Sequence, residues 1–176
     1  WGMAGDEGDA YAYHFETGGV HFFALNSEDD IGPMDEGVTW LAERLVEVEQ
    51  EPGYRFTVLF FHHPIYTLAR HGPKQNLREM LLPIIARHDI PLVLQGHNHV
   101  YERFVADDVT YVTTGGGGSG LYNLDENVEN FPEDAPLRVA AARAFHAMML
   151  EIDSTTIRGR AADDSGQEID AFQITY

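Results

Sequence analysis

The stretch "PLVLQGHNHVYERF", Pro91 to Phe104, sets two closely spaced histidines at the end of a short apolar run. The run stops at Gly96, and glycine allows a chain to leave a strand through a turn. Alternate histidines on a strand share a face and can hold one metal ion. Because the glycine comes first, His97 and His99 are expected in a turn, where their rings are free to serve two ions instead. Histidines that only satisfy buried hydrogen bonds are the alternative.

Strands and helices alternate on either side of this stretch. Helices are predicted where apolar residues recur every three or four positions, and strands where β-branched and aromatic residues run together. The alternation favours crossover units in an α/β sheet covered on both faces, and an acidic surface loop over 121–136 leads to three antiparallel strands in the tail. The predicted strands are 20–26, 54–61, 91–95, 110–114, 145–152, 156–161 and 168–175, and the predicted helices are 34–49 and 77–87.

A second histidine-rich loop, "HHPIYTLARH" over 62–71, follows the predicted strand 54–61. Functional side chains in α/β sheets lie beyond the carboxyl ends of the strands. Two neighbouring parallel strands end at the same edge of a sheet. The loops at 62–71 and 97–99 are therefore expected to lie side by side, although about thirty residues separate them in sequence.

The composition excludes several classes of protein. With 29 acidic and 11 basic residues, the formal net charge of −18 opposes binding to a nucleic-acid backbone or to anionic lipid. No apolar run reaches the roughly 18–20 residues that cross a bilayer, so no membrane span is predicted. The chain has no cysteine, so a metal ion must be held by His, Asp, Glu, Asn or Tyr.

The two histidine loops together carry a resemblance to a known family. "HHP" at 62–64 and "GHNHVYER" at 96–103 resemble motifs of the calcineurin-like metallophosphoesterases, in their purple-acid-phosphatase-like branch. The resemblance extends from about residue 13 to the C-terminus. It implies the C-terminal portion of a four-layer α/β/β/α sandwich, with mixed sheets, flanking helices and C-terminal antiparallel strands. Residues 1–176 are then expected to form a single catalytic domain that is N-terminally incomplete.

The resemblance also implies a site and a reaction. His62 and His97 would bind one metal ion and His99 a second, the ions being iron, zinc or manganese. His71 matches a histidine that contacts the phosphate, and as the catalytic residue it would stabilise developing charge or protonate the leaving group. The implied reaction is hydrolysis of small-molecule phosphate monoesters by a metal-bridging hydroxide, because two cations offset the repulsion between an anionic ester and its nucleophile. The implied location is secreted or the cell envelope.

The remaining histidines are given other roles. His63 adjoins a predicted ligand and is expected to support it or to pack. His14, His21 and His88 are interpreted as structural, and His146 is left open between the two roles.

Upstream motifs of the family are not found in this sequence. They would supply a bridging aspartate, an asparagine ligand and a catalytic histidine, whereas "GDEGD" at 5–9 is interpreted as a flexible acidic loop. Three histidines without that aspartate should not assemble a two-metal centre. The 176-residue chain alone is therefore expected to be inactive or nearly so, and the functional prediction concerns the intact protein.

Three other functions stay open. The first is a phosphodiesterase or nucleotidase of the same fold. The second is a mononuclear cupin-type enzyme, because His97, His99 and Glu102 form an H-x-H-x-x-E pattern. The third is a degenerate, non-catalytic homologue that keeps the fold as an acidic binding module.

Overall fold

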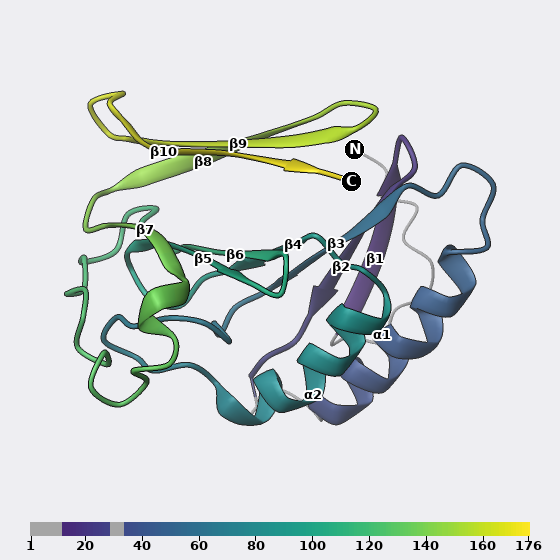
Figure 1. Cartoon of the computed structure of the whole chain (residues 1–176), viewed down its shortest axis with the longest axis horizontal. Coiled ribbons are helices and arrows are strands. Elements are labelled where there is room, and N and C mark those ends of the chain that lie inside the picture. Colours follow the sequence, from purple (N-terminus) through teal and green to yellow (C-terminus); the bar gives the residue numbers. More distant parts are fainter. Residues whose placement is uncertain (1–11, 29–33) are drawn as a thin grey trace.

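Two stacked β-sheets and one layer of helices make up the fold (Figure 1). The computed structural model describes residues 12–28 and 34–176. Within them the larger sheet has the strand order β1-β2-β3-β4-β6-β5-β7 and the smaller one β10-β9-β8. The strands of the larger sheet are β1 (Ala12–Thr17), β2 (Val20–Leu25), β3 (Phe56–Phe61), β4 (Leu92–Gln95), β5 (Tyr101–Ala106), β6 (Val109–Thr114) and β7 (Arg138–Ala142). The other elements are β8 (His146–Ile152), β9 (Thr156–Asp163), β10 (Glu168–Thr175), the helices α1 (Met34–Val48) and α2 (Gln75–Arg87), and the 3-10 helix η1 (Ala135–Leu137).

The centre of the larger sheet is parallel, as the alternation of strands and helices predicts. β2 pairs with β3, β3 with β4 and β4 with β6, all in parallel. β1, β5 and β7 pair antiparallel and make the sheet mixed. The three antiparallel tail strands are also confirmed. β3 and β4 therefore end side by side, and each leads into one of the histidine loops.

Both faces of the larger sheet are covered, and each face has its own apolar core. On one face α1 and α2 pack through residues at helical spacing, including Leu41, Leu45 and Leu81, all with fully buried side chains. The other face packs against the smaller sheet around Val58, Leu92 and others. The described residues thus account for an α/β/β order, three of the four layers expected (Figure 1).

Three strands, β1, β5 and β7, are absent from the sequence prediction. β5 is the most informative, because its sequence "YERFVA" contains two charged residues that are normally found at the surface. Here Glu102 is completely buried, and Arg103 is partly buried. Each of these charges has a partner that comes from a distant part of the chain.

The "YER" segment of β5 joins the layers through alternate side chains. Arg103 donates to both carboxylate oxygens of Asp170 on β10, at 2.6 and 3.0 Å, and the Tyr101 hydroxyl donates to the same carboxylate at 2.6 Å. Burial alone would raise the pKa of Asp170, but the bonds from Arg103 and Tyr101 outweigh burial and hold this pKa below its usual value. Glu102 bonds instead to the loop that carries the second group of histidines. The motif is thus a structural connector between the smaller sheet and the histidine loops.

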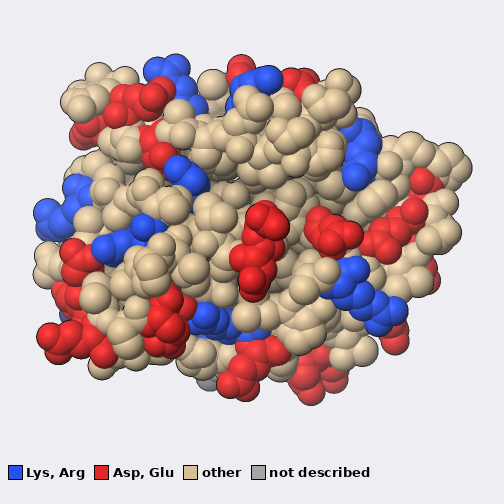
Figure 2. All heavy atoms as spheres, in the orientation of Figure 1, with Lys and Arg blue, Asp and Glu red and all other residues tan. Residues whose placement is uncertain are grey.

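Charged side chains of both signs are mixed on the surface of the described residues (Figure 2). On the face shown in Figure 2, basic side chains are interspersed with acidic ones and form no continuous band. Among the helices described, none is long and apolar enough to cross a membrane.

Candidate metal centre

The two histidine loops meet at the carboxyl ends of β3 and β4, as predicted. The Gly96 N–H donates to the His62 carbonyl at 3.0 Å, which joins the two loops through the backbone. His97 then adopts a left-handed conformation with φ of 63°, and its ring turns back toward His62. As a result, His62 Nε2 and His97 Nδ1 lie 3.0 Å apart.

This pair of nitrogens has a spacing that suits one metal ion. Imidazole nitrogens bind zinc at roughly 2.0–2.1 Å with tetrahedral angles, so two of them on one ion lie about 3.3 Å apart, a few tenths of an ångström more than here. A carboxylate is also close, since one oxygen of Glu28 lies 3.8 Å from His62 Nε2 and 3.5 Å from His63 Nδ1. Within residues 12–28 and 34–176, however, no three His, Asp or Glu side chains form a group arranged to hold an ion. The described residues therefore offer two nitrogen ligands, which is fewer than a closed site needs.

The electrostatics of the cluster keep His97 neutral. Burial lowers its pKa to about 4, and repulsion from His63, His62, His71 and His99 adds to this effect. Only the neutral ring has a lone pair for a metal ion. His97 is therefore in its ligand form at neutral pH.

The lowered histidine pKa values predict that stability falls in acid. Burial also lowers the pKa of His63 and of His21, which lies on β2. In the unfolded chain these rings take up protons near pH 6.5, whereas folded His97 takes one up only near pH 4. The unfolded state then binds more protons between these pH values, so the free energy of unfolding should fall as pH decreases from about 6.5 to about 4.

Urea unfolding of the metal-free protein, with a chelator present, measures this effect. A His97→Gln variant, which cannot titrate at this position, should lose part of the pH dependence. An equal slope with pH in His97→Gln and the unmodified protein would contradict the assignment.

His99 is oriented by a different loop. Its Nδ1 donates to the Gly120 carbonyl at 2.8 Å, which leaves Nε2 as the nitrogen able to accept a ligand bond. Its ring stacks on Tyr122, with centroids 4.2 Å apart and an angle of 19° between the planes. In the described part of the chain, no hydrogen bond joins His99 to the His62–His97 pair. The structure therefore places two of the predicted ligands together and turns the third toward Tyr122.

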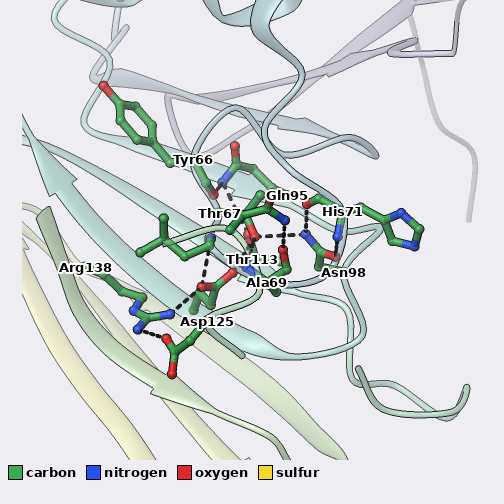
Figure 3. Close-up of polar contacts among 12 residues, drawn as sticks. Tyr66, Thr67, Ala69, His71, Gln95, Asn98, Thr113, Asp125 and Arg138 are labelled. Atoms are coloured by element: carbon green, nitrogen blue, oxygen red, sulfur yellow. Dashed lines mark hydrogen bonds and ion pairs between the residues drawn. The ribbon is translucent and has the colours of Figure 1, made fainter. Parts of the chain in front are cut away.

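Asn98, which lies between His97 and His99, is hydrogen-bonded to the backbone of His71 (Figure 3). Its side chain is completely buried. Its Oδ1 accepts from the His71 N–H at 3.0 Å, and its Nδ2 donates to the His71 carbonyl at 2.7 Å and to the Thr67 hydroxyl at 2.8 Å. The His71 ring itself is exposed, with its centroid 4.7 Å from that of His97. The backbone of His71 is thus held rigidly while its ring faces the site.

Glu102 continues this polar network beneath the site. Its carboxylate accepts from the Thr67 hydroxyl, from the Leu68 N–H at 3.2 Å and from Arg138 at 3.0 Å. Arg138 also bonds to Asp125, as Figure 3 shows. Since Glu102 is occupied in this way and the fold is α/β, the cupin-type interpretation of His97, His99 and Glu102 is wrong.

The loop over 121–136 is held by bonds near its middle and near its end. Asp134, which is completely buried, accepts two bonds from Arg78 on α2, at 2.7 and 2.8 Å. The Asn127 N–H donates to the Leu68 carbonyl at 2.9 Å. The bonds therefore hold this loop against α2 and against the loop over 62–71.

The other histidines have partners in the fold. His63 lies 3.0 Å from the Ser27 carbonyl through Nδ1, and its ring packs on His97. Elsewhere, His14 and His21 lie 2.8 Å apart, and His88 lies 2.7 Å from Glu49. His146 lies 2.9 Å from the Ala144 carbonyl and 3.1 Å from Thr114. The "GDEGD" segment at 5–9 lies outside the described residues.

Sequence reasoning missed Glu28, Asn98 and Tyr122 as parts of the site. For Asn98 a signal existed, because an amide inside a histidine pair at a strand end has few ways to satisfy its hydrogen bonds except with a neighbouring loop. Glu28 and Tyr122 carry no comparable signal. They approach the histidines only because distant loops fold together.

The chain is similar in sequence to plant proteins named as purple acid phosphatases. No family model matches the chain. It is 30% identical over 180 residues to the Arabidopsis thaliana protein named "Probable purple acid phosphatase 20", covering 93% of this chain and 41% of that protein. It is also 30% identical over 98 residues to "Probable inactive purple acid phosphatase 9" of the same plant, covering 53% of this chain and 15% of that protein. The chain thus spans less than half the length of these relatives.

The fold has a counterpart among solved structures. Purple acid phosphatase PPD1 from yellow lupin (Lupinus luteus) superposes with a TM-score of 0.77 at 19% sequence identity. The match covers 93% of this chain and 32% of the lupin chain. The expected metallophosphoesterase architecture is therefore confirmed.

Proposed function

Since this chain is a purple-acid-phosphatase-like member of the calcineurin-like metallophosphoesterases, we propose that the intact protein hydrolyses small-molecule phosphate monoesters with two metal ions. The observation that carries the proposal is the 3.0 Å approach of His62 Nε2 to His97 Nδ1 at the carboxyl edge of the sheet. The ions would be iron, zinc or manganese. When bound, they would offset the charge of the phosphoryl oxygens and activate water as the nucleophile.

The residues of this chain have separate roles in the proposal. His62 and His97 hold one ion, and His99 contributes Nε2 to the other because its Nδ1 is committed to the Gly120 carbonyl. The other ligands of both ions would come from outside the described residues, among which no three His, Asp or Glu side chains are grouped to hold an ion. His71 contacts the phosphate and assists departure of the leaving alkoxide. The resemblance also supports a secreted or cell-envelope location for the intact protein.

Metal binding is tested directly by removing a proposed ligand. We expect His97→Ala to weaken binding of zinc or manganese by about a hundredfold or more, because even residues that only support metal ligands change affinity by about 10–100-fold. Isothermal titration measures this in the 176-residue chain and in the intact protein. His88→Ala is the matched control, since His88 bonds to Glu49 at 2.7 Å and both residues lie outside the histidine cluster. Equal metal affinity in the two variants would rule out the assignment.

Activity is tested on the intact protein with p-nitrophenyl phosphate and bis-p-nitrophenyl phosphate. Metal-dependent turnover of the monoester, lost in His97→Ala and kept in His88→Ala, is the expected result. Faster turnover of the diester would favour the phosphodiesterase alternative. Metal binding without turnover of either ester would favour a non-catalytic homologue, an outcome to which the relative named as inactive gives some weight. The 176-residue chain alone is expected to show little or no turnover.

A further inference from the structure

An exposed arginine, Arg70, lies beside the histidine cluster. It directly precedes His71. In the described part of the chain, no carboxylate is bonded to it. Six other arginines form salt bridges with carboxylates, namely Arg44, Arg78, Arg103, Arg138, Arg158 and Arg160.

The guanidinium of Arg70 is held over an aromatic ring. Its Cζ atom lies 5.3 Å from the centroid of Tyr122. Tyr122 in turn stacks on His99, and its ring meets that of His71 at a centroid distance of 5.1 Å and an angle of 68°. A guanidinium on an aromatic face keeps its N–H edge available for hydrogen bonds in the plane of the group. The cation thus lies at the rim of the site, next to two of the proposed functional histidines.

Backbone bonds fix both members of this pair. The Tyr122 N–H donates to the His99 carbonyl at 3.2 Å, and Arg143 donates to the Tyr122 carbonyl at 3.0 Å. The side chain of Asn127 donates to the carbonyl of Arg70 at 3.1 Å. Because the main chain on each side is anchored, binding an anion has to order only the Arg70 side chain, which the Tyr122 ring already supports.

We propose that Arg70, supported by Tyr122, is a second anion subsite beside the phosphoryl site. The inference rests on the proposed function, which places the reacting phosphoryl group at the histidines. A guanidinium recognises phosphate or carboxylate oxygens through paired hydrogen bonds. The preferred substrates are therefore phosphate esters or anhydrides that carry another anionic group within reach of Arg70, with inorganic pyrophosphate as the simplest probe.

The test compares two anions on the intact, metal-loaded protein by isothermal titration. Pyrophosphate should bind more tightly than inorganic phosphate. Arg70→Ala should weaken pyrophosphate binding about tenfold and phosphate binding by less than about twofold, as expected for one lost charge-assisted contact. Arg87→Ala is the matched control, because it removes the same charge from the exposed last turn of α2 and should change neither affinity. Tyr122→Phe should behave like the unmodified protein, whereas Tyr122→Leu should lose part of the pyrophosphate preference.

The possible failures can be told apart. If Arg70→Ala weakens both anions equally, weakens neither, or if neither anion binds, the subsite is refuted. If p-nitrophenyl phosphate is hydrolysed but pyrophosphate shows no preference that depends on Arg70, the subsite fails and the phosphatase proposal stands. If no ester is hydrolysed but the preference for pyrophosphate depends on Arg70, the phosphatase proposal fails and the subsite stands.

Discussion

Replacing Glu102 with alanine should lower the free energy of unfolding by about 3 kcal/mol or more, since removal of one partner from a buried ion pair costs about 3–5 kcal/mol. Glu102 is completely buried and bonds to Arg138 at 3.0 Å. Its loss would also leave two donors without this acceptor, namely the Leu68 N–H, which donates to it at 3.2 Å, and the Thr67 hydroxyl. Arg138 would keep only its bond to Asp125, whose side chain is 60% exposed.

Two further variants distinguish the loss of a buried, hydrogen-bonded carboxylate from the loss of an exposed one. Glu102→Gln keeps the shape and one acceptor oxygen, so its cost should be clearly smaller than that of Glu102→Ala. Glu168→Ala removes an exposed carboxylate whose partner is Arg160, with side-chain exposures of 49% and 57%, and should cost less than about 1 kcal/mol. Urea unfolding measures all three. A Glu102→Ala cost no greater than that of Glu168→Ala would show that the network in Figure 3 contributes little.

Replacing Gly115 with alanine should also destabilise the protein, by about 3 kcal/mol, at the upper end of the range of about 1–3 kcal/mol for overpacking. A Cβ atom there would lie 2.1 Å from the Asn98 carbonyl oxygen and 2.9 Å from its carbon. Both contacts are with backbone, which cannot rotate away as a side chain can. The displaced segment lies between His97 and His99, so metal affinity should fall about tenfold as well.

The same run of glycines contains its own control. A Cβ atom on Gly117 would meet nothing within 4 Å. Gly117→Ala should therefore change the free energy of unfolding by no more than about 0.5 kcal/mol and leave metal affinity unchanged. Urea unfolding and isothermal titration of the two variants provide the comparison. Similar behaviour of Gly115→Ala and Gly117→Ala would mean that close packing against Asn98 is unimportant.

Individual strands explain which parts of the fold are predictable. β2, β3 and β4 are continuous apolar runs because both of their faces are covered, and such runs are visible in sequence. β5 is not visible, because Glu102 and Arg103 interrupt the apolar pattern and are tolerated only through Arg138 and Asp170. A local pattern cannot report a partner 36 or 67 residues away.

Some contacts in the candidate site are also predictable from sequence, and others are not. That His62 and His97 lie close together is predictable, because each follows a predicted strand and parallel strands bring their carboxyl ends to one edge. The contact of Tyr122 with His99 and the clamp of Asn98 on His71 depend on loop conformations, for which the sequence offers no periodic signal.

By itself, the sequence determined the α/β class, the parallel centre of the sheet, the antiparallel tail and the edge at which the histidines gather. These features follow from local periodicity and from the position of polar residues at strand ends, which neighbouring residues encode. Only the tertiary structure decided that His62 and His97 face each other, that His99 turns toward Tyr122, and that Arg70 lies over that ring. Side-chain directions in loops are set by hydrogen bonds and ring contacts between distant segments, and those contacts exist only once the sheet has brought the segments together.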